Sequence, residues 1–351
     1  MIDRLRNIFR IDMGIDLGTC NTLVCVRGEG IVLNEPSVVA VRKGTNKVMM
    51  VGGQPAVGFV AKEMLGKAPG SISVIRPLKD GVISDFEITE TMLGYFIKKV
   101  VGNRPWISPR VVIAVPGGIT PVEKAAVFDA ARRAGAGRVY LVEEPMAAAL
   151  GSDLPVTEAT ASMIVDIGGG TTDIAITSLA DIAHSETVRT AGDEFDTAIV
   201  DHMKNNYKLL IGEQTAERIK VGIGSASQDG EDRSMEVRGR DVITGLPRKV
   251  EVTGEEIRQC LQEPLQEIVS AVLRTLERCD PELSSDLIEN GIVLAGGGAL
   301  LRGLPTMISN ATGLACRVAD DPLTCVARGT AHFLENFELL QDAMESDNGG
   351  R

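Results

Sequence analysis

Two aspartates, Asp16 and Asp166, each stand near the end of an apolar run, shortly before a glycine turn that carries hydroxyl side chains. Glycines allow backbone N–H groups to converge on a phosphate, hydroxyls add donors, and a nearby carboxylate can hold a hydrated Mg²⁺. Both patterns therefore predict phosphate clamps, with Mg²⁺ held through water by the two aspartates. The residues expected to line them are Gly18, Thr19, Cys20 and Asn21 after Asp16, and Gly168, Gly169, Gly170, Thr171 and Thr172 after Asp166.

Neither turn fits the other common phosphate-binding templates. A dinucleotide fingerprint or a P-loop requires its glycines to open a helix, and the P-loop also ends in Gly-Lys-Ser/Thr. After Gly170, residues 171–176 read as a strand instead. An ordinary β-hairpin with a glycine turn is the alternative for either copy alone. Two copies, one near the start of each half, favour two related lobes that close on one nucleotide.

A third glycine stretch, residues 291–301, passes from a strand-like run into an Ala/Leu-rich segment. Its backbone can close over a nucleotide base or ribose. The residues expected to do so are Gly296, Gly297, Gly298 and Ala299.

The three glycine motifs resemble the two phosphate motifs and the adenosine motif of the actin, Hsp70 and sugar-kinase superfamily. Within it, the sequence is most similar to the MreB family of bacterial actin homologues, from about residue 10 to about residue 335. Further segments that resemble this family are 30–40, 75–83, 143–149, 215–220 and 298–303. The resemblance implies a two-lobed, actin-like (ribonuclease H-like) α/β fold, with duplicated mixed sheets flanked by helices and two inserted subdomains.

The residue pattern and the resemblance together imply a division of the chain. An amphipathic membrane-binding helix is expected at 1–10, and a C-terminal helix at 322–340 is expected to return to domain I before a disordered tail at 341–351. Domain I is expected at 11–150 with an inserted subdomain at about 34–77, and domain II at 151–321 with one at about 186–250.

Glu144 follows a predicted strand at 139–142, at the strand end where open α/β sheets place their ligands. A carboxylate there can orient the water that attacks a γ-phosphate, although it can also be no more than a favourable charge at a helix N-terminus. The resemblance places the hydrolytic glutamate on Glu144. Asp166 and Thr171 are expected to assist it.

Three further residues are assigned to the nucleotide by resemblance. Asp196 stands where the family has a carboxylate near the sugar or the metal, and Glu217 and Lys220 share one helical face, where they can hold a ribose hydroxyl and a base edge. A pair at this spacing is more often a surface ion pair. ATP and Mg²⁺ are the implied cofactors.

Composition narrows the class of protein. The net charge is −12 and no block of Lys or Arg is present, which argues against nucleic acid as a partner. The six cysteines form no C-x-x-C pair, so reduced thiols in a cytosol are expected. No uncharged apolar run reaches the ~20 residues of a spanning helix. The protein is expected to be soluble, or peripheral to a membrane.

Two segments suit a membrane surface. In residues 1–10, Ile2, Leu5 and Phe9 share one helical face and arginines lie on the other, a pattern typical of helices that bind anionic lipid. The loop with Trp106 and Ile107 between two arginines suits the interface. For the first segment, the alternatives are a frayed terminus or a helix packed on the protein's own surface. For the second, the alternative is a tryptophan folded onto the core.

Three functions fit these observations. The first is a cytoskeletal ATPase that forms filaments, as single or paired protofilaments, on the inner face of the cytoplasmic membrane. By resemblance it maintains rod shape with the cell-wall elongation and shape proteins. The second is a metabolic kinase, although no stretch reads as its catalytic base. The third is an Hsp70-like switch, for which no peptide-binding domain is expected after the ATPase core.

Overall fold

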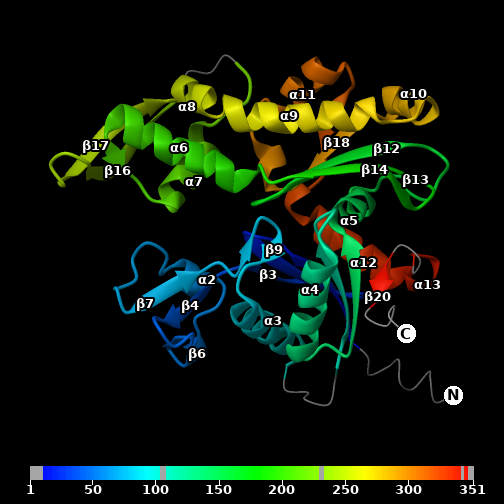
Figure 1. Cartoon of the computed structure of the whole chain (residues 1–351), viewed down its shortest axis with the longest axis horizontal. Helices are drawn as coiled ribbons and strands as arrows, with labels where there is room; N and C mark the ends of the chain where they lie inside the picture. Colours follow the sequence, from blue (N-terminus) through cyan, green and yellow to red (C-terminus); the bar gives the residue numbers. More distant parts are fainter. Residues whose placement is uncertain (1–10, 103–107, 229–232, 341–343, 347–351) are drawn as a thin grey trace. The chain divides into compact units, whose positions relative to one another are not determined.

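The computed structural model describes residues 11–102, 108–228, 233–340 and 344–346 (Figure 1). The chain forms two compact units. The first runs to Ala159 and includes Thr177–Ile182 and the residues from Leu323 on, and the second comprises Thr160–Ile176 and Ala183–Pro322. The first unit extends past the boundary expected at residue 150 because the following turn bonds back to the preceding helix, where Leu154 N–H donates to the Ala149 carbonyl at 3.1 Å.

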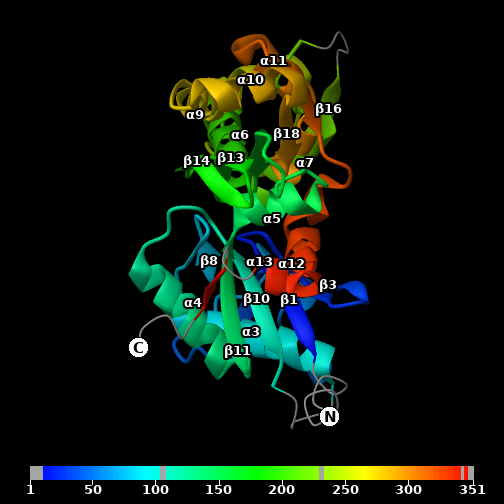
Figure 2. The same cartoon turned by 90° about the vertical axis from the view of Figure 1, so that its right-hand side faces the viewer.

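The first unit is built on a six-stranded mixed sheet in the order β20-β11-β10-β1-β2-β3. Its central strands β1, β10 and β11 are parallel and lie side by side in Figure 2, while β2, β3 and β20 run antiparallel to their neighbours. The strands are β1 (Asp12–Leu17), β2 (Asn21–Val26), β3 (Gly30–Pro36), β10 (Arg110–Val115), β11 (Arg138–Glu143) and β20 (Glu345–Ser346).

Helices cover both faces of this sheet. Met13 and Ile15 of β1 belong to the core that α3 and α4 complete, whereas an added β-carbon on Gly14 would overlap the Thr330 hydroxyl of α12. Because successive strand residues point to opposite faces, α12 must lie opposite α3 and α4. The helices are α3 (Phe86–Val101), α4 (Pro121–Arg133), α5 (Glu144–Gly151), α12 (Cys325–Glu335) and α13 (Phe337–Leu340).

A smaller cluster of short elements interrupts the first unit between β3 and α3. It contains β4 (Val39–Arg42), β5 (Met50–Val51), β6 (Gln54–Pro55), α2 (Phe59–Lys62), β7 (Ile72–Ile75), β8 (Leu78–Lys79) and β9 (Val82–Ile83). Val38, Ala40, Ala56 and Ala61 form its separate small core.

The second unit repeats the plan with a five-stranded sheet in the order β14-β13-β12-β18-β19 and a three-stranded sheet in the order β15-β16-β17. The strands are β12 (Ser162–Ile167), β13 (Thr172–Ser178), β14 (Asp181–Val188), β15 (Leu209–Leu210), β16 (Ser234–Asp241), β17 (Pro247–Thr253), β18 (Ile292–Ala295) and β19 (Cys316–Val318). The helices are α6 (Gly192–Tyr207), α7 (Glu213–Ile223), α8 (Gly254–Cys260), α9 (Gln262–Glu277), α10 (Pro281–Asn290), α11 (Leu304–Thr312) and the 3₁₀ turn η1 (Gly297–Leu300). A second 3₁₀ turn, η2 (Pro322–Thr324), begins at the last residue of this unit.

Local sequence signals explain several helix starts. Thr120 caps α4 in a full capping box with Glu123, followed by a proline at the first helical position. Thr253 and Glu256 form the same box at α8. A buried apolar stripe of α9 that includes Leu265 packs into the core of the second unit.

The tail differs from the expectation of disorder at 341–351. Within it, Glu345–Ser346 form β20, which pairs with Tyr140 and Leu141 of β11. Lys124 Nζ lies 2.7 Å from Glu345 Oε2 and fixes the strand from the side. The open edge of β11 supplies backbone partners that tail composition does not reveal.

Candidate nucleotide-binding site

The first predicted clamp lies in the turn between β1 and β2. Gly18 has room for no side chain, because an added β-carbon would stand 2.7 Å from the Asn21 carbonyl oxygen. The Thr19 hydroxyl accepts a hydrogen bond from Gly81 N–H at 3.1 Å and keeps its own proton to donate. Burial raises the pKa of Asp16 to about 7. A cation beside this carboxylate would therefore restore its charge.

Ser37 braces this turn, and sequence reasoning did not identify it. Its hydroxyl donates to the Gly18 carbonyl at 2.6 Å, and its N–H donates to the Cys20 carbonyl at 3.0 Å. The Ser37 side chain is fully buried and also lies 2.9 Å from the Thr22 hydroxyl. One residue thus holds both sides of the glycine turn.

Glu144 is the first residue of α5 and follows β11 directly. The register pairs Asp16 of β1 with Ala114 of β10, and Ala114 with Val142 of β11. Asp16 and Glu144 therefore reach the same carboxyl edge of the sheet, on strands two spacings, or about 10 Å, apart. This is the edge where open α/β sheets bind ligands.

In the second unit, β12 and β18 bring two glycine stretches to one sheet edge. Asp166 pairs in register with Ala295, immediately before Gly296. An added β-carbon on Gly296 would overlap the Asp166 carboxylate, and one on Gly298 would overlap the side chain of Ile167. Only glycine permits this approach, so the third glycine stretch packs directly against the second clamp.

The second clamp is docked on the start of α6. Gly192 N–H donates to the Gly168 carbonyl at 3.2 Å, and Asp193 N–H donates to the Gly169 carbonyl at 2.8 Å. Within the described residues, the amides of Gly169 and Gly170 donate to no protein acceptor. Such amides suit a phosphate, so the cradle fits a nucleotide.

Thr172 has a different role from its neighbour Thr171. Its hydroxyl donates to the Thr190 carbonyl at 2.7 Å, which commits its proton to the protein. The Thr190 hydroxyl donates in turn to Glu267 of α9 in a short hydrogen bond. This chain of bonds fixes the second strand of the clamp, and neither Thr190 nor Glu267 carries a sequence signal for that role.

Lys220 connects α7 to the start of α6. Its ammonium donates to the Gly192 carbonyl at 3.0 Å and lies 2.9 Å from Asp196 Oδ1. Burial raises the pKa of Asp196 to about 6 despite the opposing effect of Lys220. Glu217 lies exposed on the same helix. The structure thus brings Asp196 and Lys220 together beside the second clamp.

Arg302 joins α7 to the third glycine stretch. Its guanidinium donates from Nη2 to the Gly224 carbonyl at the end of α7, at 2.9 Å. Its own carbonyl accepts from Ala226 N–H at 2.7 Å. The elements expected to hold phosphate, sugar and base are therefore tied together within the second unit.

The five predicted membrane residues, Ile2, Leu5, Phe9, Trp106 and Ile107, lie outside the described residues. In the described part of the chain, no helix has the length and apolar character needed to cross a bilayer. The described residues also contain no cluster of three or more His, Cys, Asp or Glu side chains suited to a metal.

Comparison with known proteins identifies the family. The sequence model of the MreB/Mbl protein family matches residues 10–342. The chain belongs to the MreB/Mbl family. This MreB/Mbl chain is 54% identical to the cell shape-determining protein MreB of Escherichia coli over 345 residues, which cover 97% of each protein. It is 48% identical to the cell shape-determining protein Mbl of Bacillus cereus over 333 residues, which cover 95% of this chain and 98% of that protein.

Solved structures confirm the actin-like fold of this MreB/Mbl chain. MreB5 of Spiroplasma citri bound to ADP matches with a TM-score of 0.88 and 36% identity, covering 95% of this chain and 98% of that one. The MamK double helical filament matches with a TM-score of 0.78 and 25% identity, covering 93% and 99%. Family membership supports a cytoskeletal role in cell shape over the kinase and switch alternatives.

Proposed function

We propose that this MreB/Mbl chain binds ATP with Mg²⁺, taking phosphate ligands from both glycine turns. The observation that carries the proposal is the cradle of the second unit, where the amides of Gly169 and Gly170 have no acceptor among the described residues and lie beside a glycine-lined Asp166. Spiroplasma citri MreB5 has been solved with ADP and with AMPPNP, which supports a nucleotide here. Bound Mg²⁺ would neutralise phosphate charge, and Asp16 and Asp166 would hold it through water.

Hydrolysis is assigned to the carboxyl edge of the first unit. Glu144 would orient the attacking water, and Thr171 would donate to the transferred phosphate. Replacing Glu144 with Gln should lower the rate of ATP hydrolysis by roughly a hundredfold without weakening ATP binding. Glu143→Gln is the matched control, because it removes the adjacent carboxylate at the same helix start and should leave the rate unchanged.

Binding and hydrolysis are separable by experiment. Asp166→Asn should weaken Mg²⁺-dependent binding of a fluorescent ATP analogue by roughly tenfold to a hundredfold, since a charge-assisted contact contributes about 1.5–3 kcal/mol. If Asp166→Asn and the wild type bound the ATP analogue with equal affinity, the second clamp would not be part of the nucleotide site. Equal rates of ATP hydrolysis by Glu144→Gln and the wild type would refute the catalytic role of Glu144 but leave the proposed ATP binding intact.

We further propose that the ATP-bound chain assembles into filaments that lie on the inner face of the cytoplasmic membrane and organise peptidoglycan elongation. The MamK double helical filament supports assembly. Weak anchors repeated along a polymer act together as one avid contact with anionic lipid. The first ten residues and the Trp106-Ile107 loop supply these anchors, and shape-complex proteins are the implied partners.

Sedimentation with ATP and phosphatidylglycerol vesicles tests the membrane step. Phe9→Glu and Trp106→Glu should each leave filaments intact but lower the fraction that sediments with vesicles. Val122→Glu is the control, because Val122 is an apolar side chain that is 79% exposed elsewhere on the chain. Co-sedimentation of all three variants with vesicles at the wild-type level would reject the two anchors.

A further inference from the structure

One edge of strand β16 is open along most of its length. The sheet order is β15-β16-β17, and β17 pairs with β16 from Ser234 to Arg240. On the other side, β15 pairs only with Arg240 and Asp241. Within the described residues, β16 between Ser234 and Gly239 therefore has a strand neighbour on one side only. An open edge of this kind is a template for one more strand.

The hydrogen-bond pattern shows which residues face this open edge. Asp241 N–H donates to the Leu246 carbonyl on the β17 side, and Val242 N–H donates to the Lys208 carbonyl on the β15 side. Because backbone groups alternate along a strand, the even-numbered residues of β16 turn toward the open side. Glu236 and Arg238 therefore present their N–H and C=O groups there.

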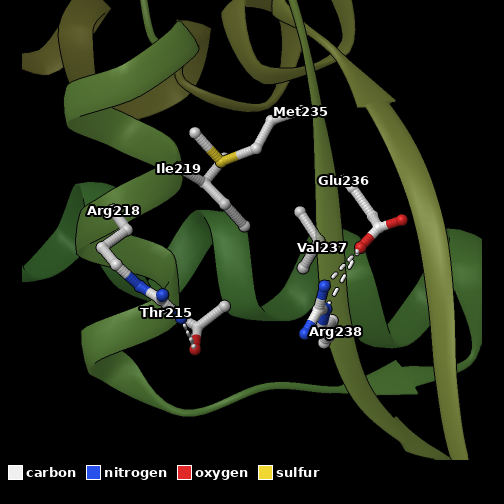
Figure 3. Close-up of a pocket in the computed structure, with 7 residues that line it drawn as sticks. All are labelled: Thr215, Arg218, Ile219, Met235, Glu236, Val237 and Arg238. Carbon is white, nitrogen blue, oxygen red and sulfur yellow. Dashed lines mark hydrogen bonds and ion pairs between the residues drawn. The ribbon is translucent and has the colours of Figure 1, made fainter.

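A cavity of about 320 Å³ lies along the same edge, between β16 and α7. Figure 3 shows its lining residues, with Ile219 of α7 beside Met235 and Val237 of β16. Ile219 and Val237 are buried, so the floor is apolar. An apolar side chain on an added strand would have space here, next to backbone groups that can receive its main chain.

The rim of the cavity is positively charged in a chain of net charge −12. Arg218 donates to the Thr215 hydroxyl at 3.1 Å and, in the described part of the chain, has no carboxylate partner. Glu236 is shared between Arg238 at 3.0 Å and Lys249 at 3.1 Å. Of the charged side chains that line the cavity, Arg218 and Arg238 are cationic and Glu236 is anionic, and this net positive charge favours an anionic ligand.

We propose that the open edge of β16 binds an extended segment of a partner protein as an added strand, with apolar residues in the cavity and acidic residues alternating with them. Main-chain hydrogen bonds to Glu236 and Arg238 would supply affinity, and the cavity and Arg218 would supply specificity. Binding of the partner segment at this edge does not require a bound nucleotide. The added strand would contact α7, the helix of Glu217 and Lys220, and any coupling to ATP through α7 rests on the proposed function.

The test uses the full chain and a fluorescein-labelled seven-residue peptide of alternating Val and Glu. Its fluorescence anisotropy should rise saturably with protein concentration. Glu236→Pro should abolish the rise, because proline removes the donor that faces the open edge and leaves the ladder to β17 intact. Glu236→Gln removes the same charge but keeps the N–H, so it should bind the peptide at least as well as the wild type.

Two further comparisons separate strand addition from simple charge attraction. Arg218→Gln should weaken binding by roughly tenfold, whereas Arg240→Gln, an exposed arginine of β16 outside the cavity lining, should not. A peptide methylated on alternate backbone nitrogens keeps its charge but cannot complete the ladder, and it should not bind. This peptide arm decides the question even if Glu236→Pro fails to fold.

Equal binding of the methylated and unmethylated peptides, or no anisotropy change at 1 mM protein, a concentration on the order of the weakest affinities considered, would overturn the proposal. So would a Glu236→Pro variant that loses self-association while the wild type ignores the peptide, since the edge would then belong to a second copy. Binding of the fluorescent ATP analogue, measured on the same variants, shows whether a failure concerns this edge alone or the nucleotide site as well.

Discussion

Gly151 of α5 and Gly329 of α12 face each other so closely that a β-carbon on Gly151 would stand 2.7 Å from the Gly329 backbone nitrogen. A side chain at Gly329 would be equally crowded, because its β-carbon would stand 2.8 Å from Ala147 Cα and would overlap the Ala147 carbonyl. Figure 1 shows the two helices side by side in the first unit. Their backbones can meet only because both positions lack a side chain.

Gly329→Ala should therefore destabilise the protein by about 3 kcal/mol or more, since the obstacle is backbone rather than a flexible side chain. Urea unfolding followed by circular dichroism measures the change. Gly94→Ala is the matched control within helix α3, because its β-carbon would meet Ala134 only at 3.8 Å. That variant should gain roughly 0.5–1 kcal/mol from the loss of a helical glycine. Equal stabilities of the two variants would contradict the packing.

The buried pair of Asp12 and Arg110 gives a second prediction. Arg110 donates to Asp12 at 3.1 Å and 2.5 Å, and its guanidinium carbon lies 4.0 Å from the centre of the Phe337 ring. Arg110→Met should cost about 3–5 kcal/mol because it leaves a buried carboxylate without its main partner. Arg133→Met should cost less than about 0.5 kcal/mol, since Arg133 is 65% exposed and lies 4.0 Å from Glu90.

A double variant completes this test. Asp12→Leu combined with Arg110→Met removes both charges and should recover much of the stability lost by the single change. Purely additive losses in the denaturant midpoints would show that the two side chains act independently.

Ser37 gives a third prediction, which joins stability to binding. Removing its hydroxyl in Ser37→Ala frees the Gly18 carbonyl and should cost about 1–2 kcal/mol of stability. Because the same bond shapes the first clamp, affinity for the fluorescent ATP analogue should also fall, by roughly tenfold. Thr275→Val is the control, since it also removes a hydroxyl that donates to a carbonyl, that of Ala271 at 3.0 Å, within helix α9. It should lose stability without losing ATP affinity.

The sequence predicted the parts of the fold that short-range signals encode. Apolar strands before and after Asp16 and Asp166 became β1, β2, β12 and β13, and Thr120 gave the start of α4. These features depend on residues within a few positions of one another, so pattern and capping chemistry suffice. The actin-like fold that the resemblance implied is confirmed by solved relatives.

The long-range hydrogen bonds that support the candidate site could not be predicted from such local patterns. Ser37 is nineteen positions from Gly18, and Arg302 is seventy-eight positions from Gly224. Nothing in the local sequence distinguishes either from an ordinary strand serine or surface arginine, because their partners are set by the tertiary fold. The same reason applies to β20, whose two residues find Tyr140 and Leu141 only after β11 has formed an edge.

Lys220 has protein partners that neither spacing nor resemblance predicted. Spacing alone favoured a surface ion pair with Glu217, and the family assigned both residues to the nucleotide. The structure gives Lys220 two protein partners on α6, the Gly192 carbonyl and the Asp196 carboxylate. Contact with a nucleotide stays a prediction. Its position supports a role in holding the first turn of α6 against the second clamp.

Asp196 supplies the pH prediction. Its pKa rises from 3.8 to about 6 in the folded protein, mainly because burial disfavours the charged carboxylate. The folded state therefore binds this proton more tightly than the unfolded state does. The resulting stability is fully present below pH 3.8 and is lost as the pH rises through about 6.

Asp196→Asn removes this titration while keeping the size of the side chain. The free energy of unfolding of the wild type, relative to that of Asp196→Asn, should therefore decrease by about 1–2 kcal/mol as the pH rises from roughly 4 to 7, after allowance for the partial exposure of Asp196. Urea titrations at several pH values measure this difference directly. A relative stability that instead increases over this range would mean that the ion pair with Lys220 outweighs burial, and that the folded carboxylate is stabilised in its charged form.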